Sequence, residues 1–127
     1  MKKTAVIHDL SGFGKCSLTA AIPILSVMGV QAVPLPTAVL SGQTGYGDYV
    51  CEDFTAPMSS ISKLWKRQAV EFDGIYSGFL LNERQADQIL EFIRDFSGRE
   101  TLVVVDPVLG DNGKRYDIFD SQMELAA

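Results

Sequence analysis

The sequence predicts an α/β fold, a parallel sheet in a three-layer αβα arrangement with helices on both faces. Short apolar runs rich in β-branched residues occur at 4–8, 73–77 and 101–105, and segments with helical apolar spacing lie between them. The runs carry apolar residues on both faces, as buried parallel strands do. With 127 residues, of which 46% are hydrophobic and 21% charged, the chain has the size and composition of one globular domain.

The first run, residues 4–8, predicts a buried strand, and residues 9–12 predict a loop that opens a helix over 15–28. Gly29 suits the left-handed residue that ends such a helix, and Pro23 is expected to kink it. The apolar residues that recur at helical spacing are Leu18, Ala21, Ile22, Leu25 and Met28.

Residues 30–39 predict an extended segment, because Pro34 and Pro36 forbid a helix and disfavour a central hydrogen-bonded strand. A glycine-rich loop is expected over 41–47. Thr55 is expected to cap the next helix, whose first turn tolerates Pro57 and whose apolar face would consist of Ile61, Leu64 and Trp65.

Residues 73–77 predict a second buried strand. Asn82 and Gln85 have the spacing of a capping box, and the apolar stripe that follows ends at Gly98, which predicts a helix. Residues 101–105 predict a third buried strand that runs into Asp106. The tail 121–127 has the pattern of the beginning of another helix.

Charge and motif counts exclude several functions. A net charge of −5 offers no positive field for a nucleic acid or an anionic membrane surface. No signal peptide or membrane span is evident, so we expect a soluble cytoplasmic protein. One histidine and two cysteines without CxxC spacing make a zinc cage unfavourable.

The loops that follow the strands are the candidate functional segments, since ligands collect at the carboxyl ends of parallel strands. The loop from Asp9 to Lys15 fits neither a Walker loop nor a dinucleotide fingerprint, and a tight structural turn is an open alternative. In the loop Ser41–Asp48, Gln43 and Thr44 offer donors and acceptors for a neutral polar ring, with a flexible loop as the alternative.

The third segment pairs two acids. Asp106 ends an apolar strand and Asp111 follows five residues later, which suits a hydrated Mg²⁺ bridging to nucleotide phosphates. Alternatively, Asp111 belongs to a solvated turn. His8 closes the first strand with no second histidine or cysteine to join it, so a hydrogen-bonded structural role is favoured over catalysis.

Together these segments resemble the pyridoxal kinase family of the ribokinase-like superfamily over nearly the whole chain. The resemblance implies a ribokinase-like (Rossmann-like) fold and ATP-dependent phosphorylation of the 5′-hydroxyl of a vitamin B6 vitamer: pyridoxal, pyridoxamine or pyridoxine. It rests on the ordered segments Ser11–Gly14, Met28–Val30 after the internal Pro23, Gln43–Gly47, Asp73–Leu80 and Val105–Asp111.

The resemblance also implies roles for particular residues. Ser11 and Thr44 would hydrogen-bond the pyridine ring, and Phe79 would flank it. Gln43 stands where many relatives have histidine, which leaves the vitamer preference open. Asp106 and Asp111 would lie near Mg²⁺ and the ATP phosphates, and a homodimer is implied.

By the same resemblance, residues 1–127 correspond to the amino-terminal part of one kinase domain, with no second domain. The fold would be incomplete at its carboxyl end. The catalytic base and nucleotide loops of the family would lie in a second half, so we expect little activity from this chain and an unpaired strand edge. The alternatives are a hydroxymethylpyrimidine kinase of thiamine synthesis and a noncatalytic B6-binding fragment. A receiver domain is disfavoured because Asp9 stands alone after the first strand.

Overall fold

The computed structural model describes residues 1–42, 48–108, 110–111 and 114–115, the last two pairs by their backbone only. The helices are α1 (Leu18–Val27), α2 (Thr55–Arg67) and α3 (Glu83–Phe96). The strands are β1 (Lys3–Phe13), β2 (Gln31–Gly42), β3 (Cys51–Asp53), β4 (Gly74–Ser77), β5 (Leu102–Val105), β6 (Gly110–Asp111) and β7 (Lys114–Arg115).

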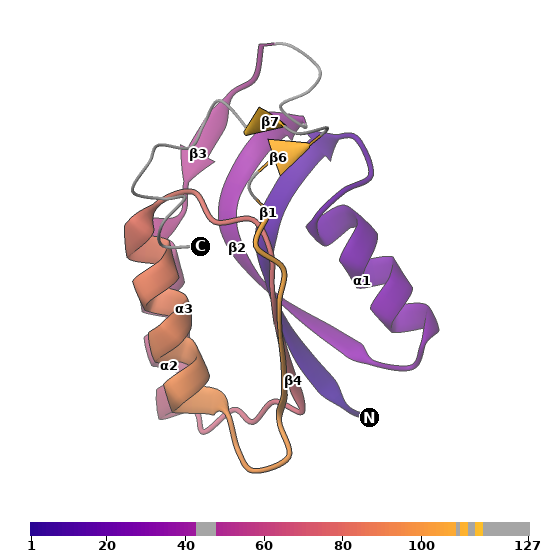
Figure 1. Cartoon of the computed structure of the whole chain (residues 1–127). Coiled ribbons are helices and arrows are strands. Elements are labelled where there is room, and N and C mark those ends of the chain that lie inside the picture. The colour runs from indigo at the N-terminus through magenta and orange to yellow at the C-terminus, as the bar shows by residue number, and fades with distance from the viewer. Residues whose placement is uncertain (43–47, 109, 112–113, 116–127) are drawn as a thin grey trace.

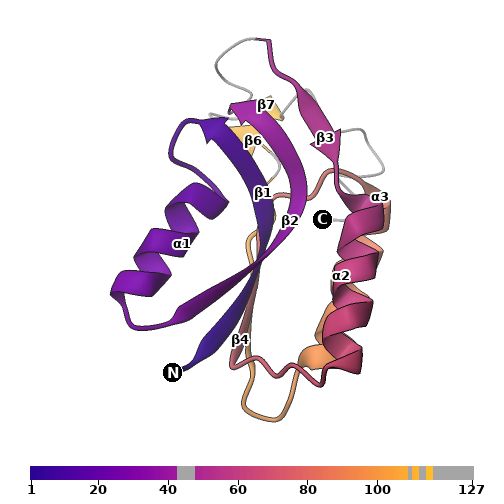
Figure 2. The same ribbon diagram turned by 180° about the vertical axis from the view of Figure 1, so that it is seen from behind.

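The main sheet has the strand order β3-β2-β1-β4-β5. Its strands pair in parallel, except that the short β3 is antiparallel to β2. Helix α1 covers one face, and α2 and α3 lie side by side over the other (Figures 1 and 2). This is the three-layer α/β arrangement that the sequence predicts. Strands β6 and β7 form a separate antiparallel pair.

The hydrophobic core lies between the sheet and the α2–α3 layer. An aromatic cluster fills part of it, with Phe72 in contact with Phe92 and Phe96 at ring-centroid distances of 5.7 and 5.5 Å. Trp65 packs edge-on against Phe72. The buried residues of this core are Ala5, Ile7, Leu35, Met58, Phe72, Ile75, Ile89, Phe92 and Phe96.

Strand β1 is longer than predicted. The expectation of a loop at residues 9–12 is wrong, because β2 extends to Gly42 and supplies main-chain partners along this stretch: Ser11 pairs with Leu40, and Phe13 with Gly42. An irregularity in register lies between His8 and Leu10. Ser11 therefore occupies a strand and is held more rigidly than a loop residue would be.

The prediction that Pro34 and Pro36 keep their segment out of the sheet interior is also wrong, since β2 lies between β1 and β3. The N–H of Gln31 donates to the carbonyl of Lys2, so the N–H groups of odd-numbered residues in the first part of β2 point toward β1. Pro34 and Pro36 are even-numbered, so their backbone nitrogens point away from β1, toward the β3 side of β2. Strand β3 pairs only with residues 38–40, so neither proline displaces a ladder hydrogen bond.

Helices α1 and α2 begin differently from the predictions. Helix α1 starts at Leu18, three residues after the expected position, and ends as predicted with Gly29 at φ +81°. Thr55 is the first residue of α2 rather than its cap. Asp53 accepts hydrogen bonds from the Thr55 N–H, at 2.8 Å, and from its hydroxyl. Two residues expected on apolar faces, Met28 and Leu64, are exposed.

The second half follows the predictions more closely. Strand β4 and helix α3 lie where expected, and the Asn82 side chain accepts a 3.0 Å hydrogen bond from the N–H of Gln85. Strand β5 also has the predicted position, but its side chains are exposed rather than buried, because β5 is the last strand of the sheet. Among the described residues, no helix has the length and apolar character needed to cross a membrane.

Candidate active site

Strands β4 and β5 end beside the middle of β1, which continues past them to Phe13, and main-chain hydrogen bonds join the three strands at this point. The N–H of Gly78 donates to the carbonyl of Ile7 at 3.0 Å, and the N–H of Asp106 donates to the carbonyl of Ser77 at 2.9 Å. In an α/β sheet this carboxyl edge is the usual place for a ligand. The polar residues at its ends therefore form the candidate site.

Asp9 and Ser11 form a buried polar pair in the part of β1 that extends beyond the end of β4. Both side chains are buried, and the Ser11 hydroxyl donates a 2.7 Å hydrogen bond to Oδ2 of Asp9. A buried carboxylate is costly without such a partner. The hydroxyl oxygen of Ser11 can still accept a hydrogen bond from a ligand. Asp9 was not among the predicted site residues, although an acid that follows an apolar strand was the signal that identified Asp106.

His8 lies beside this pair on β1. Its side chain is 5% exposed and contacts the Tyr76 ring edge-on at 4.4 Å between centroids. Burial lowers the pKa of the imidazole, while the nearby carboxylates of Asp9 and Asp106 act in the opposite direction. His8 is therefore held neutral near pH 7. The expected hydrogen-bonded role is not fully met, since Nε2 has no partner within the described part of the chain.

The predicted ring-binding residues Gln43 and Thr44 lie outside the described residues, and so does the Asp111 side chain. The described residues do fix where strand β2 ends. Gly42, its last residue, pairs with Phe13 at the end of β1. Strands β1 and β2 therefore end beside each other.

Phe79 follows β4 at this edge. Its carbonyl accepts a 3.0 Å hydrogen bond from the hydroxyl of Thr37, and its side chain is 8% exposed. Thr37 in turn offers its own carbonyl to the side chain of Gln85, at 2.7 Å. These bonds attach the segment after β4 to β2 and α3, which fixes the backbone at position 79. That the Phe79 ring flanks a ligand stays a prediction.

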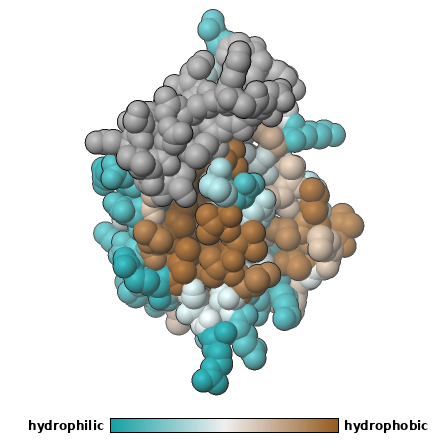
Figure 3. Space-filling model, viewed as in Figure 1, coloured by the Kyte–Doolittle hydropathy of each residue, from teal (hydrophilic) through white to brown (hydrophobic). Residues whose placement is uncertain are grey.

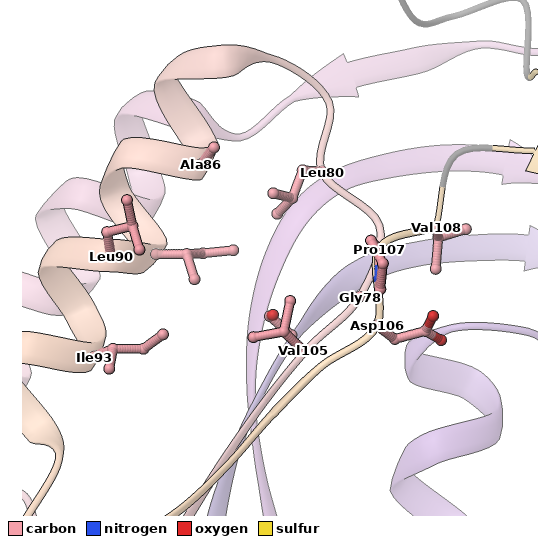
Figure 4. Close-up of a pocket in the computed structure, with 11 residues that line it drawn as sticks. Gly78, Leu80, Ala86, Leu90, Ile93, Val105, Asp106, Pro107 and Val108 are labelled. Carbon is pink, nitrogen blue, oxygen red and sulfur yellow. The ribbon is translucent and has the colours of Figure 1, made fainter. Parts of the chain in front are cut away.

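Asp106 is exposed at the end of β5, where it borders two grooves. In Figure 4 its carboxylate points away from the apolar side chains of the groove beside α3. No group of three or more histidine, cysteine or acidic side chains that could hold a metal occurs among the described residues. A single exposed carboxylate fits Mg²⁺, which takes most of its ligands from water and phosphate when it is bound with a nucleotide.

We compared the chain with known proteins. No protein-family model and no curated protein matches it. Among solved structures it is 50% identical, with a TM-score of 0.96 over 98% of its length, to a Bacteroides thetaiotaomicron protein assigned as a phosphomethylpyrimidine kinase and crystallised with pyridoxal. It is 32% identical to the pyridoxal kinase of Lactobacillus plantarum, with a TM-score of 0.89 over 99% of its length. The pyridoxal kinase of Leishmania donovani, crystallised with ADP and pyridoxamine, shares the fold at 19% identity over 99% of this chain and 45% of its own, with a TM-score of 0.77.

These comparisons confirm the resemblance to the pyridoxal kinase family and the ribokinase-like fold that the motifs predict, and they show that the chain is also similar to phosphomethylpyrimidine kinases. The chain spans less than half the length of these relatives: 44% of the Bacteroides protein and 45% of the Lactobacillus enzyme.

Proposed function

We propose that this chain forms the substrate side of an ATP-dependent kinase that phosphorylates the 5′-hydroxyl of a vitamin B6 vitamer. One observation carries the proposal: the Asp9–Ser11 pair on β1 and the Asp106 carboxylate after β5 lie at one edge of the sheet, on either side of β4. The 50% identity to a protein crystallised with pyridoxal supports a B6 ring as the substrate.

In this proposal the β1 side of the edge binds the ring. Ser11 presents a hydroxyl whose proton is committed to Asp9, so it accepts a hydrogen bond from the protonated pyridine nitrogen or from the ring's phenolic hydroxyl. Gln43 and Thr44 would complete the polar contacts, and Phe79 would lie against the ring. Rigid placement in a strand favours this role, because positioning supplies most of the rate in phosphoryl transfer.

The β5 side of the edge would receive the nucleotide. Asp106, together with Asp111, would hold Mg²⁺ through water and phosphate oxygens, and the ion would neutralise charge on the transferred phosphoryl group. The neutral His8 adds no positive charge there. A general base must lie within hydrogen-bond reach of the substrate hydroxyl. We assign none in this chain, so we expect it to bind a vitamer without measurable turnover on its own.

A second candidate is a hydroxymethylpyrimidine kinase, favoured by the assignment of the Bacteroides relative. The two substrates share an aromatic nitrogen and a hydroxymethyl group. They differ in the substituent beside that group, which is an aldehyde in pyridoxal and an amine in the pyrimidine, and pyridoxal also carries a phenolic hydroxyl on the next ring carbon. A preference for one ring therefore reports which substituents the site recognises.

Isothermal titration calorimetry of the chain with pyridoxal and with hydroxymethylpyrimidine tests the proposal. We expect micromolar binding of pyridoxal and at least tenfold weaker binding of the pyrimidine, about 1.4 kcal/mol. Ser11→Ala should weaken pyridoxal binding by roughly tenfold. Ser60→Ala, at an exposed serine on α2, is the matched control and should have no effect.

Two results would contradict the proposal. Binding of neither ring would remove it, and a preference for the pyrimidine would replace it with the second candidate. Incubation with Mg-ATP and chromatography of the products tests the expectation about turnover. Formation of a 5′-phosphate by the purified chain would show that it contains its own base.

A further inference from the structure

Gln85 is a polar side chain enclosed entirely by the protein, with an exposed fraction of 0%. Its Nε2 donates to the Thr37 carbonyl at 2.7 Å and to the Thr55 hydroxyl oxygen at 3.1 Å. Its Oε1 accepts from the N–H of Leu81 at 2.7 Å. The capping bond to Asn82 uses only the main-chain N–H of Gln85. The side chain therefore serves a purpose separate from the start of α3.

Thr37, which receives one of these bonds, lies at an irregularity in the pairing of β2 with β1. The flanking pairs are His8–Pro36 and Leu10–Val39. Between them two residues of β2 stand opposite one residue of β1, Asp9, which is the arrangement of a β-bulge. The Thr37 carbonyl accepts from the N–H of Phe54, at 3.1 Å, as well as from Gln85. Gln85 is thus bonded to the position of β2 that faces the Asp9–Ser11 pair.

The bonds form a closed set that joins β2, the segment after β4 and α3. The Thr37 hydroxyl donates to the carbonyl of Phe79 at 3.0 Å, and the N–H of Leu81 donates to Gln85. The third bond runs from Gln85 to Thr37. Displacing any one of the three members breaks two hydrogen bonds. Such a set fixes relative positions more firmly than a single bond does.

One side of the segment after β4 is open. Gly78 and Leu80 line the groove beside α3, which has a volume of about 120 Å³ (Figure 4). Figure 3 shows apolar side chains gathered at the surface between the two helix layers on this side of the molecule. The bonds from Thr37 and Gln85 therefore hold the segment from its inner side, where Phe79 is attached to β2.

We propose that Gln85 is a positioning residue of the ring-binding site. It would fix the place of Phe79 relative to the Asp9–Ser11 pair, and that spacing would set how tightly an aromatic ring is held. Gln85 itself would not touch the ring, because its side chain is enclosed. The proposal rests on the proposed function, since Phe79 and Ser11 are the residues assigned there to the ring.

Gln85→Met and Gln88→Met form a matched pair of variants. Methionine has a similar length and removes the amide's hydrogen bonds. Gln88 lies on the same helix, and its Nε2 donates to the Thr55 carbonyl at 2.8 Å, a bond that involves neither Thr37 nor the segment after β4. In calorimetry, Gln85→Met should bind pyridoxal roughly tenfold more weakly than the wild type, and Gln88→Met should bind it equally well. Circular dichroism verifies that each variant is folded.

Gln85→Glu adds a pH profile that a general loss of stability would not produce. A neutral carboxyl group can donate to the Thr37 carbonyl, whereas a carboxylate has no donor. Two acids lie around the network: Asp53 bonds to Thr55, and Asp9 stands opposite Thr37. These acids and burial favour the neutral form of the new carboxyl group. The ratio of its Kd to that of the wild type should fall toward one as the pH falls from about 8 to about 5.5, while the ratio for Gln85→Met stays constant.

Hydrogen exchange tests the positioning without a ligand. The N–H of Phe54 bonds to the same carbonyl as Gln85, so its exchange reports a displacement of Thr37. We expect this amide to exchange roughly tenfold faster in Gln85→Met than in the wild type. It should be unchanged in Gln88→Met.

The outcomes distinguish this proposal from the proposed function. Equal affinity of the wild type and Gln85→Met for pyridoxal would overturn the positioning role and leave the proposed function standing. Equal weakening by Gln88→Met would also overturn it, because the effect would then be a loss of stability. Binding of neither ring by the wild type would refute the proposed function. Exchange at Phe54 would then decide whether Gln85 fixes this edge of the sheet, and an unchanged rate would show that it does not. If Gln85→Met does not fold, Gln85→Glu replaces it, and a Kd ratio independent of pH overturns the proposal.

Discussion

The position of His8 depends on the absence of a side chain at Gly78. A Cβ atom at position 78 would lie 2.5 Å from Cε1 and 2.6 Å from Nδ1 of the imidazole. The ring is buried against Tyr76 and has little room to move. Gly78→Ala should therefore lower the free energy of unfolding by about 1–3 kcal/mol, measured by urea denaturation.

Gly98→Ala is the matched control. The nearest atom to a Cβ at position 98 is the Thr101 hydroxyl oxygen at 3.6 Å, an ordinary contact. This substitution should be neutral or slightly stabilising, because it reduces the freedom of the unfolded chain. Equal effects of the two substitutions would show that His8 is not confined by Gly78.

The lowered pKa of His8 predicts a particular pH dependence. The unfolded imidazole takes up a proton near its ordinary value of 6.5, whereas the folded one does so only at lower pH. Unfolding is therefore favoured as pH falls through 6.5, with a slope of at most about 1.4 kcal/mol per pH unit from this group. Between pH 7 and 5.5 the free energy of unfolding of the wild type should fall more steeply than that of His8→Gln.

The chain has one histidine, so proton NMR can follow its imidazole without overlap from others. We expect the native resonance to titrate below 6.5. A midpoint at or above 6.5 would mean that the carboxylates of Asp9 and Asp106 outweigh burial. The site edge would then carry a positive charge near neutral pH.

At the scale of elements, helices α1 and α2 end in the same way with different residues. Gly29 and Ala69 both have positive φ, +81° and +55°, and the next residue in each case bonds back to the last turn. Alanine pays a steric cost in this conformation. Ala69→Gly should stabilise the protein by about 0.5–1 kcal/mol, and Gly29→Ala should destabilise it by a similar amount. Thermal unfolding of both variants measures the two changes in stability. Changes of the same sign would contradict the argument.

The elements predicted correctly are those whose signals are local. The Asn82–Gln85 capping box and the apolar stripe of α3 depend on residues three or four apart, and Gly29 acts through its own φ. Errors occurred where a distant segment decides. The length of β1 depends on β2 beside it, and Pro34 is tolerated because β3 is short.

The same reasoning explains what the sequence could show of the site. Asp106 was predicted because an acid at the end of an apolar strand is a local pattern, and the resemblance added Ser11. The buried contact between Ser11 and Asp9 depends on β1 continuing as a strand, which the local sequence does not indicate. Gln85 was predicted only as a capping residue. Its bonds to Thr37 and Thr55 require the fold to bring α3 against β2 and α2.

At the scale of the whole molecule, strand β5 should control self-association of the chain, because its side chains are exposed and the described residues place no strand beyond it. Exposed apolar edge strands promote aggregation, and lysine on such an edge opposes it. Leu102→Lys together with Val105→Lys should lower light scattering severalfold at high protein concentration and should leave the melting temperature nearly unchanged, because both side chains are already more than half exposed.

Val50→Lys separates this effect from a general effect of charge. Val50 is 71% exposed and lies outside β5, so a lysine at this position changes the net charge without changing the edge strand. It should leave scattering unchanged or raise it slightly, since one added positive charge on a chain of net charge −5 lowers the repulsion between copies. If Val50→Lys suppressed scattering as strongly as the β5 variant, the exposed strand would not be the site of association. A strong effect of the β5 variant alone would identify this edge strand as the site of association.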